Sequence, residues 1–403
     1  ATCGFGTFLD TWRRLMPIRN RFAELHSEIA GWRQSLHAHP ELQFDVHWTA
    51  AFVAERLGEF GCDEVVTGIG RTGVVALIKG RGAPSGRVVG LRADMDALPI
   101  HEETGVEYAS QVPGKMHACG HDGHTAMLLG AAKYLCETRN FAGTVAVIFQ
   151  PAEEGGAGGR EMVDDGMIER FGIDEVYGMH NVPGRALGEF AIRPGAFYAS
   201  TDEINIKITG KGGHAAQPHQ TIDATLVGAH VVTALQSIVS RQIDPVDQVV
   251  VSITSFETST TAYNVVVEDV VLKGTLRTMT EENRAFAKRR IIEIAEGISS
   301  SLGAQAVATI EEGYPVMVNS ATHTEFAAEA AAKVAGACED APIYLWGEDF
   351  GFMLNARPGA YIHLGIGDNA PLHHPKYNFN DEAIPSGCSF FVEVAESRLP
   401  IDR

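Results

Sequence analysis

The sequence has few basic residues for its length. Among its 403 residues, Lys and Arg together number 32 and Asp and Glu number 51, which gives a formal net charge of −19. Binding to nucleic acid or to an anionic membrane surface requires clustered Lys and Arg side chains. We therefore expect neither a nucleic acid nor a membrane among the partners of this protein.

The sequence also lacks long apolar runs. None approaches the roughly 20 residues that cross a bilayer, and the first fifteen residues contain no apolar core of the kind that a signal peptide carries. Met16-Pro17-Ile18-Arg19 resembles a natural start. We expect residues 1–15 to be a vector-derived leftover or an upstream extension, and we give them no function.

Cysteines are few and widely spaced. The six stand at positions 3, 62, 119, 136, 338 and 388, and no two form a CxxC pair. Extracellular disulfide frameworks and zinc ribbons show closer spacings. We therefore expect a reduced, cytoplasmic setting.

The order of predicted elements indicates a first domain of the α/β class. A chain of this length exceeds one ordinary core, so two domains are expected. Helices alternate with continuous apolar strands, which is typical of a largely parallel, doubly wound sheet whose ligands bind beyond the carboxyl ends of the strands. The predicted helices are 21–36, 48–60 and 125–137, and the strands are 73–78, 87–92, 143–150 and 175–179.

A different pattern follows. Residues 202–209 alternate between polar and apolar, which predicts a strand with one wet face. The next predicted elements complete a β-α-β-β-α order with a possible fourth strand, which is typical of a ferredoxin-like α+β insert. They are 221–240, 249–256, 270–278, 281–300 and 305–311. The predicted domains are therefore 16–198 and 313–403, which form one α/β domain, and the insert 199–312.

One short stretch has an unusual density of reactive side chains. Residues 115–124 contain three histidines, a cysteine and an aspartate. Cys119 and His121 are two apart, so an extended segment would place both on one face, where a thiolate and an imidazole suit a borderline-soft divalent metal. His124 shares a helical face with His121, and a ligand, a partner that orients a ligand and a helix cap are all open for it.

Two adjacent carboxylates, Glu153 and Glu154, follow the predicted strand 143–150. Such a pair is commonly a solvated turn. Its place after a buried strand and before a Gly-rich segment favours a site instead. One carboxylate would then bind metal and the other would take a proton from water.

Several further polar residues are each compatible with a structural role and with a functional role. His180, His373 and His374 are compatible with packed or capping roles as well as with metal ligation. His214 and His219 lie in a predicted loop of the insert and are either incidental or able to stabilise a developing oxyanion. Arg277 is either a solvated strand charge or a bidentate partner of a substrate carboxylate, and Asn264 lies in the same region.

Together these segments resemble the N-acyl-amino-acid amidohydrolases. This family comprises bacterial aminoacylases, hippurate hydrolases and indoleacetyl-amino-acid hydrolases, within the wider clan of dinuclear metallo-carboxypeptidases. The resemblance rests on residues 36–42, 91–99, 116–124, 149–155 and 372–381. It covers nearly the whole chain after Met16.

The resemblance implies two divalent ions per subunit, foremost Mn or Zn, with Co or Ni as further options. It implies that Glu153 is the general base. The family pattern Leu-His-x-Pro assigns the ligand role to His373 and leaves His374 at the variable place. The implied metal ligands are Cys119, His121, Glu154, His180 and His373.

The implied fold is a zinc-exopeptidase-like doubly wound catalytic domain, split by a ferredoxin-like dimerisation or lid domain. His214 matches a histidine that, in relatives, reaches the active site of a neighbouring subunit, which implies a homodimer or homotetramer. Asn264 and Arg277 match substrate-binding positions of the family.

The implied function is metal-dependent hydrolysis of N-acyl amino acids, either N-acetyl or N-aroyl compounds such as hippurate, to a carboxylic acid and an amino acid. Glu153 would take the proton of a metal-activated water, and His214 would stabilise the oxyanion. Asp94, Asp96 and Asp122 would orient ligand histidines. The alternatives are a dipeptidase or carboxypeptidase on the same scaffold and a catalytically silent binding protein.

The sequence departs from the family pattern at two places. Residues 259–267 lack the usual Gly-rich turn and Ile-Pro, so this loop is expected to differ in shape. Trp346 stands where a small residue is common, and its indole would narrow or line the acyl pocket.

Overall fold

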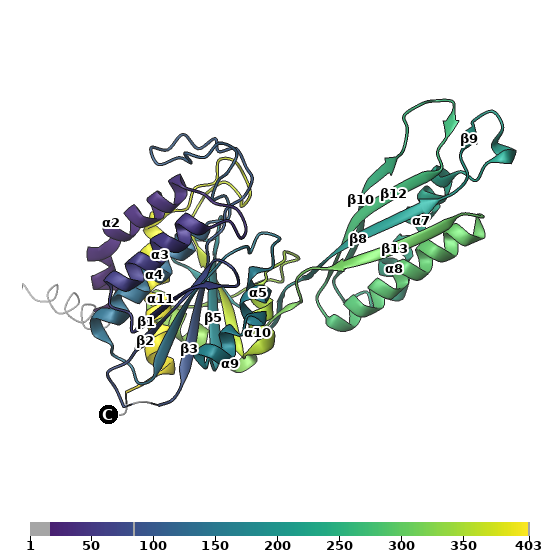
Figure 1. Ribbon diagram of the computed structural model, residues 1–403. Helices are drawn as coiled ribbons and strands as arrows, with labels where there is room; N and C mark the ends of the chain where they lie inside the picture. The colour runs from purple at the N-terminus through teal and green to yellow at the C-terminus, as the bar shows by residue number, and fades with distance from the viewer. Residues whose placement is uncertain (1–16, 84, 402–403) are drawn as a thin grey trace, which may run out of the picture. The chain divides into compact units, whose positions relative to one another are not determined.

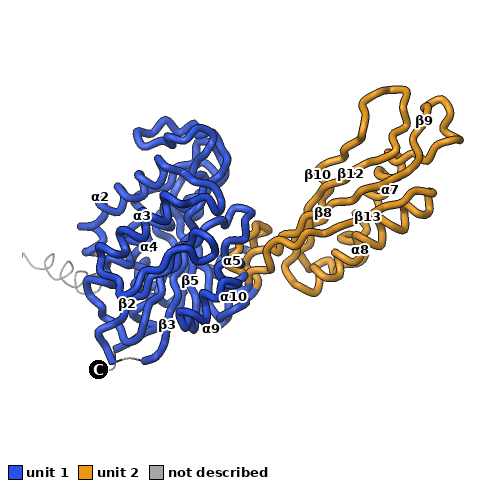
Figure 2. The backbone as a smooth tube through the Cα atoms, in the orientation of Figure 1, with its two compact units in different colours: residues 1–195, 318–342, 352–403 blue, residues 196–317, 343–351 orange. Residues whose placement is uncertain are grey.

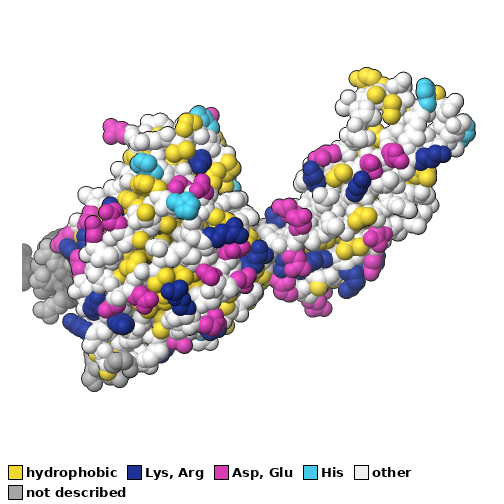
Figure 3. All heavy atoms as spheres, viewed as in Figure 1, with side chains coloured by type: hydrophobic (Ala, Val, Ile, Leu, Met, Phe, Trp, Pro, Cys, Tyr) yellow, Lys and Arg dark blue, Asp and Glu magenta, His cyan; other side chains and the backbone are white. Residues whose placement is uncertain are grey.

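The computed structural model describes residues 17–83 and 85–401 (Figure 1). The expectation for residues 1–15 lies outside this range. The chain forms two compact units (Figure 2). Unit 1 extends through Gly195 and resumes at Val318–Pro342 and from Phe352 onward, whereas unit 2 consists of Ala196–Met317 and Ile343–Gly351. On the face shown in Figure 3, basic side chains are interspersed with acidic ones.

Unit 1 contains an eight-stranded sheet, in the order β1-β2-β4-β3-β5-β16-β6-β15. Its central strands β4, β3, β5 and β16 run parallel, as predicted for an α/β fold. The sheet is nevertheless mixed, because β1 pairs antiparallel with β2, β2 with β4, and β6 with β16. The strands are β1 (Glu64–Ile69), β2 (Gly73–Lys79), β3 (Val88–Asp94), β4 (Thr144–Gln150), β5 (Glu175–Val182), β6 (Phe190–Ile192), β15 (Glu339–Asp340) and β16 (Gly359–Gly365).

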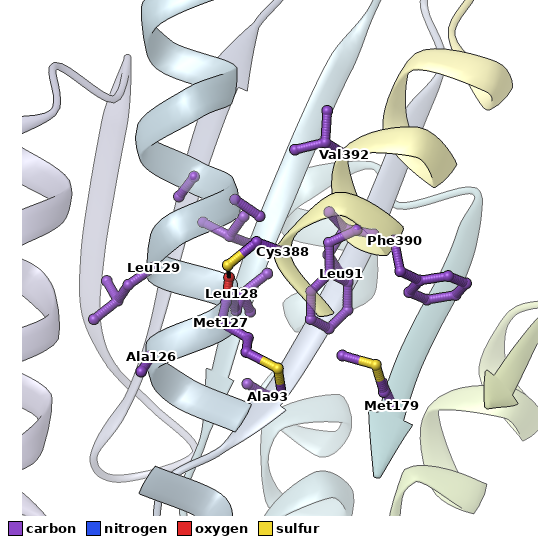
Figure 4. Packing of buried hydrophobic residues seen from close by; sticks show 14 of the residues in the cluster. Leu91, Ala93, Ala126, Met127, Leu128, Leu129, Met179, Cys388, Phe390 and Val392 are labelled. Atoms are coloured by element: carbon purple, nitrogen blue, oxygen red, sulfur yellow. Dashed lines mark hydrogen bonds between the residues drawn. The ribbon is translucent and has the colours of Figure 1, made fainter. Parts of the chain in front are cut away.

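Helix α4 (His121–Thr138) is the buried centre of the helical layers of unit 1. It packs against α2 and α11 and against β3. Figure 4 shows Met127 and Leu128 of this helix beside Leu91 of β3 and Cys388 of α11. A side chain at Gly130 would collide with Cys388 of α11 and Ile29 of α2, so glycine permits this close helix approach. The other helices are α2 (Pro17–Ala38), α3 (His47–Glu59), α5 (Gly158–Asp164), α6 (Met167–Phe171), α9 (Ala321–Ala335), α10 (Phe350–Ala356) and α11 (Ile384–Arg398).

Unit 2 contains a four-stranded antiparallel sheet, in the order β10-β12-β8-β13, with two long helices. Ile204, Ile206 and Ile208 are buried and alternate with exposed polar residues along β8, as the sequence pattern predicts. The chain order is the β-α-β-β-α-β order of ferredoxin-like folds. The elements are β8 (Ser200–Thr209), α7 (Ala224–Ser237), β10 (Val249–Thr258), β12 (Asp269–Thr278), α8 (Glu281–Ser301) and β13 (Gln305–Glu312).

Candidate metal centre

The sheet of unit 1 brings polar side chains together at one edge. Strands β3, β4 and β5 are parallel, so their carboxyl ends share that edge. Asp94 ends β3, Glu153 and Glu154 follow β4, and His180 lies near the end of β5. His121 is the first residue of α4. The edge therefore collects imidazole and carboxylate groups from four elements.

Three of the overlapping groups of donor atoms at this edge contain the ligands that the resemblance implies. Within each group, all the donor atoms lie within 4.8 Å of one another. The groups are Cys119 with His121 and His180, Cys119 with Glu154 and His373, and His121 with Glu153 and Glu154. The structure thus brings together all five side chains that the resemblance implies as ligands, and it places Glu153 beside them.

The two buried histidines present their ring nitrogens in the same way. His121 Nδ1 donates a hydrogen bond to the carbonyl oxygen of Asp96 at 2.8 Å, and His180 Nδ1 donates to the carbonyl oxygen of Asn181 at 2.7 Å. A carbonyl oxygen only accepts, so Nδ1 of each ring carries a proton, and in the neutral ring Nε2 carries the lone pair that a metal would bind. His121 Nε2 is buried without a hydrogen-bond partner among the described residues, and His180 Nε2 lies 3.4 Å from Cys119 Sγ.

The charges around these donors favour cations. Burial raises the pKa of the Cys119 thiol well above its ordinary value, and the charges of Glu154 and Glu153 act in the same direction. Burial alone would lower the pKa of His121, but the charge of Asp94 and a hydrogen bond with Asp96 raise it to about 10. Thiolate, imidazole and carboxylate ligands suit zinc and related divalent ions, so these residues fit a metal pair.

Asp96 connects the ligand histidine with the carboxylate pair. Its carbonyl oxygen accepts the hydrogen bond from His121, and its carboxylate accepts the backbone N–H groups of Glu153 at 3.0 Å and Glu154 at 3.1 Å. Asp96 is buried. It therefore fixes the main chain from which the candidate base and a candidate ligand project.

His124 is oriented by its neighbours. Its Nδ1 donates to Asp94 Oδ1 at 2.6 Å, and its Nε2 accepts hydrogen bonds from the backbone and side-chain nitrogens of Asn181, both at 3.0 Å. Donor atoms of Asp94, His121 and His124 also lie close enough together to hold a metal ion. Because both ring nitrogens of His124 are engaged, we assign it the role of positioning its neighbours.

The loop that carries Cys119 depends on Gly120. The sequence pattern predicted an extended segment here, which is wrong: Gly120 has a left-handed φ of +93°, and His121 already begins α4. The cause is tertiary, because a side chain at Gly120 would overlap Asn181 and Tyr377. Asn181 Nδ2 donates to the Cys119 carbonyl oxygen at 2.6 Å, and the Tyr377 hydroxyl donates to Asn181 Oδ1.

Asp122 contacts a histidine other than the ligands. Its Oδ2 accepts from His37 Nδ1 at 2.8 Å and lies 3.6 Å from Arg33 Nη1, while His37 Nε2 lies 3.2 Å from Glu102 Oε1. Burial alone would lower the pKa of His37, but the hydrogen bonds to Asp122 and Glu102 raise it to about 9. The motif of residues 36–42 contains His37, but the sequence pattern did not predict its contact with Asp122. The spacing offered a signal, because Arg33 and His37 are four residues apart and therefore share one face of a helix.

The two adjacent histidines near the C-terminus differ. His373 adopts a left-handed φ of +62° and its Nε2 lies 3.2 Å from Glu154 Oε1. His374 Nδ1 accepts the backbone N–H of Lys376 at 3.1 Å, which stabilises a local turn. The geometry therefore directs His373, and not His374, to the other donors.

The remaining predicted site residues belong to unit 2. His214 is exposed and pairs through its backbone with Val265. The Asn264 carbonyl oxygen accepts the N–H of Ala215, so the His214 and Asn264 segments are neighbours. Arg277 lies half-buried in β12 and forms no ion pair among the described residues; burial lowers its pKa.

Comparisons with known proteins place the chain among hydrolases. The profile of peptidase family M20/M25/M40 matches residues 90–397. A hippurate hydrolase of Campylobacter jejuni is 39% identical over 384 residues, which cover 94% of this chain and 99% of the relative. An N-acyl-L-amino acid amidohydrolase of Geobacillus stearothermophilus is 45% identical over 304 residues, with 75% and 80% covered.

Two further similar proteins are described as peptidases. Thermostable carboxypeptidase 1 of Saccharolobus solfataricus is 37% identical, with 92% of this chain and 95% of the relative covered. The crystal structure of the Bacillus subtilis YXEP protein, described as a dinuclear metal binding peptidase from the M20 family, is 34% identical. It has a TM-score of 0.83, with 94% of this chain and 99% of that chain covered.

Proposed function

Because the chain belongs to peptidase family M20/M25/M40, we propose that it hydrolyses the amide bond of N-acyl amino acids to a carboxylic acid and an amino acid. Membership confirms the resemblance that the motifs indicated. The proposed substrates are N-acetyl or N-aroyl amino acids such as hippurate. The names of the hippurate hydrolase and amidohydrolase relatives support this substrate class.

One observation carries the proposal: donor atoms of Glu153, Glu154 and His121 lie within 4.8 Å of one another. We propose that Cys119, His121, Glu154, His180 and His373 hold two divalent cations, foremost Mn or Zn. Glu153 is then left as a base. Bound there, the cations would lower the pKa of water toward about 7 and polarise the amide carbonyl.

Glu153 is proposed to move the proton. Its carboxylate takes the proton of the attacking water and delivers it to the leaving amine, a role that contributes roughly 10²–10⁴-fold to the rate. Asp96 holds the main chain of Glu153, which fixes where the carboxylate projects.

Four further residues are proposed to bind the substrate or to stabilise the oxyanion. His214 would stabilise the oxyanion in the active site of a neighbouring subunit, within a homodimer or homotetramer. Asn264 and Arg277 would bind the substrate, and the absence of an ion pair for Arg277 among the described residues supports a substrate carboxylate as its partner. Trp346, which packs on Tyr344 with ring centroids 4.4 Å apart, would line the acyl pocket.

We further propose a reduced, cytoplasmic setting for the enzyme, on the basis of the scattered cysteines. No helix among the described residues is long and apolar enough to cross a membrane.

A substrate panel tests the proposed function. Protein supplied with Mn²⁺ is assayed with hippurate, N-acetyl amino acids and dipeptides, with the Glu153→Gln variant as the control for contaminating activity. Preferential turnover of the N-acyl amino acids supports the proposal. Preferential turnover of dipeptides identifies the peptidase alternative, which the carboxypeptidase relative favours, and turnover of neither identifies a silent binding protein.

A further inference from the structure

Two cysteines outside the metal centre face each other. Cys62 lies between α3 and β1, and Cys136 lies in the last turn of α4. Their sulfur atoms are 3.6 Å apart although the residues are separated by 74 positions. Both side chains are half-buried, and both are free thiols. Neither residue has a role in the proposed amide hydrolysis.

Arg139 holds the two segments in register. Its guanidinium donates to Asp63 Oδ2 at 2.6 Å and to the carbonyl oxygen of Gly61 at 2.8 Å, which are the residues on either side of Cys62. It also donates to the carbonyl oxygen of Lys79 at 2.8 Å. Arg139 lies three residues after Cys136, at the end of α4. Its side chain therefore connects the helix end that carries Cys136 to the segment that carries Cys62.

The contact between the two thiols affects their pKa values in opposite directions. The hydrogen bond between the two thiols lowers the pKa of Cys136 and raises the pKa of Cys62, while the charge of Arg139 lowers the pKa of both. A lowered thiol pKa together with partial exposure marks the attacking cysteine of a pair. Cys388 differs, because it is fully buried and burial raises its pKa.

We infer that Cys62 and Cys136 form a reversible disulfide by exchange with a low-molecular-weight disulfide. The Cys136 thiolate attacks one sulfur of the small disulfide, which forms a mixed disulfide and releases one small thiolate. The Cys62 thiol then loses its proton and attacks Cys136 Sγ, which releases the second small thiolate. Each released thiolate takes up a proton, so the protein loses two hydrogens and the small disulfide is reduced to two thiols.

The contact requires only a short closure. The sulfurs must approach from 3.6 Å to about 2.05 Å, between segments that Arg139 already holds together. The cross-link would close a loop that includes β1, β2, β3 and the Cys119 loop. It would restrict the unfolded chain, so the oxidised protein should unfold at a higher temperature.

Peptide-level thiol mapping tests the inference. The full chain loaded with Mn²⁺ is incubated with oxidised glutathione and then denatured, free thiols are alkylated, and the digest is analysed by mass spectrometry before and after dithiothreitol. We expect a Cys62–Cys136 cross-linked peptide that dithiothreitol releases, with Cys338 and Cys388 still alkylated. The oxidised protein should melt a few degrees higher than the reduced protein.

Serine variants define the order of events. Cys62→Ser should stop at a glutathione adduct on Cys136, and Cys136→Ser should lose both the cross-link and the rise in melting temperature. Cys338→Ser, the matched control, should cross-link like the wild type. The inference is overturned if Cys62 and Cys136 of the wild type both stay free during the incubation and are recovered as alkylated peptides. It is also overturned if glutathione adducts accumulate without the cross-link.

Discussion

The carboxylate of Asp96 accepts the backbone N–H of Glu153 at 3.0 Å, although the two residues are separated by 57 positions. The same carboxylate accepts the N–H of Glu154. The main chain that carries the proposed base is thus held by a buried side chain from the loop after β3. Asp96 therefore positions the proposed base, whereas Glu153 itself would transfer the proton.

Replacing Glu153 with Gln should remove turnover and leave the metal in place. The amide keeps the size of the side chain but cannot take a proton, so kcat should fall by at least roughly 10²–10⁴-fold. Elemental analysis should give a metal content near that of the wild type. Glu154→Gln is the comparison, and it should lose metal as well as activity. Retained turnover in Glu153→Gln would remove this residue from the mechanism.

Asp96→Asn should weaken metal binding, because the substituted amide no longer holds both backbone N–H groups as a carboxylate does. We expect roughly a 10–100-fold loss of metal affinity, measured by competition with a chromophoric chelator. Asp122→Asn is a matched control, since Asp122 contacts His37 and Arg33. It should lower thermal stability more than metal affinity. Equal effects of both variants on affinity would contradict this division.

Gly120→Ala should be much more harmful than alanine at another left-handed glycine. Gly105 has φ +72° and open space around its Cα, so Gly105→Ala tests the backbone cost alone, about 1 kcal/mol. Gly120 has φ +93°, and a side chain at this position would also collide with Asn181 and Tyr377. We expect Gly120→Ala to lower the free energy of unfolding by about 3 kcal/mol or more, and to lose metal. Denaturant titration and elemental analysis measure both effects.

The His37 ion pair should make stability depend on pH. The pKa of His37 rises from 6.5 to about 9 on folding, so its contribution is complete below pH 6.5 and is lost as the pH rises toward 9. The full contribution is on the order of 3 kcal/mol. The wild type should therefore lose more unfolding free energy between pH 6 and pH 9.5 than His37→Gln does. Parallel slopes for the two proteins would exclude the proposed linkage.

Complementation should reveal whether His214 acts across a subunit interface. Both His214→Ala and Glu153→Gln should be inactive alone. If His214 serves the neighbouring subunit of a dimer, mixed dimers contain one complete site, and random exchange restores up to about a quarter of wild-type activity. If His214 acts within its own subunit, no mixed dimer has a complete site and no activity returns. Analytical ultracentrifugation should first show that the protein is oligomeric.

The sequence predicted those features that depend on local pattern. Buried strands such as β4 and the helix-strand alternation follow from apolar periodicity, and the structure confirms the α/β class. For the candidate metal centre, the residue pattern singled out Cys119, His121 and the Glu153–Glu154 pair, whereas His180 and His373 were assigned only through the family resemblance. Short strands such as β6 and β15 were missed, since three or two residues carry no measurable period.

Other features depend on contacts between distant segments. The left-handed Gly120 follows from the positions of Asn181 and Tyr377, and the partner of Asp122 follows from the packing of α2. The pairing of Cys62 with Cys136 is of the same kind, because spacing in the sequence gave no sign of it. Single-sequence patterns contain no information on which distant segments meet.

The five proposed ligands do not share the same environment. Cys119, His121 and His180 are buried in the edge of the sheet, whereas the side chain of His373 is 54% exposed and lies outside any helix or strand. In the proposed centre, the ion held partly by His373 would therefore exchange with bulk solution sooner than the ion held by buried groups. Metal depletion should then proceed in two kinetic phases, with a half-loaded enzyme as its intermediate.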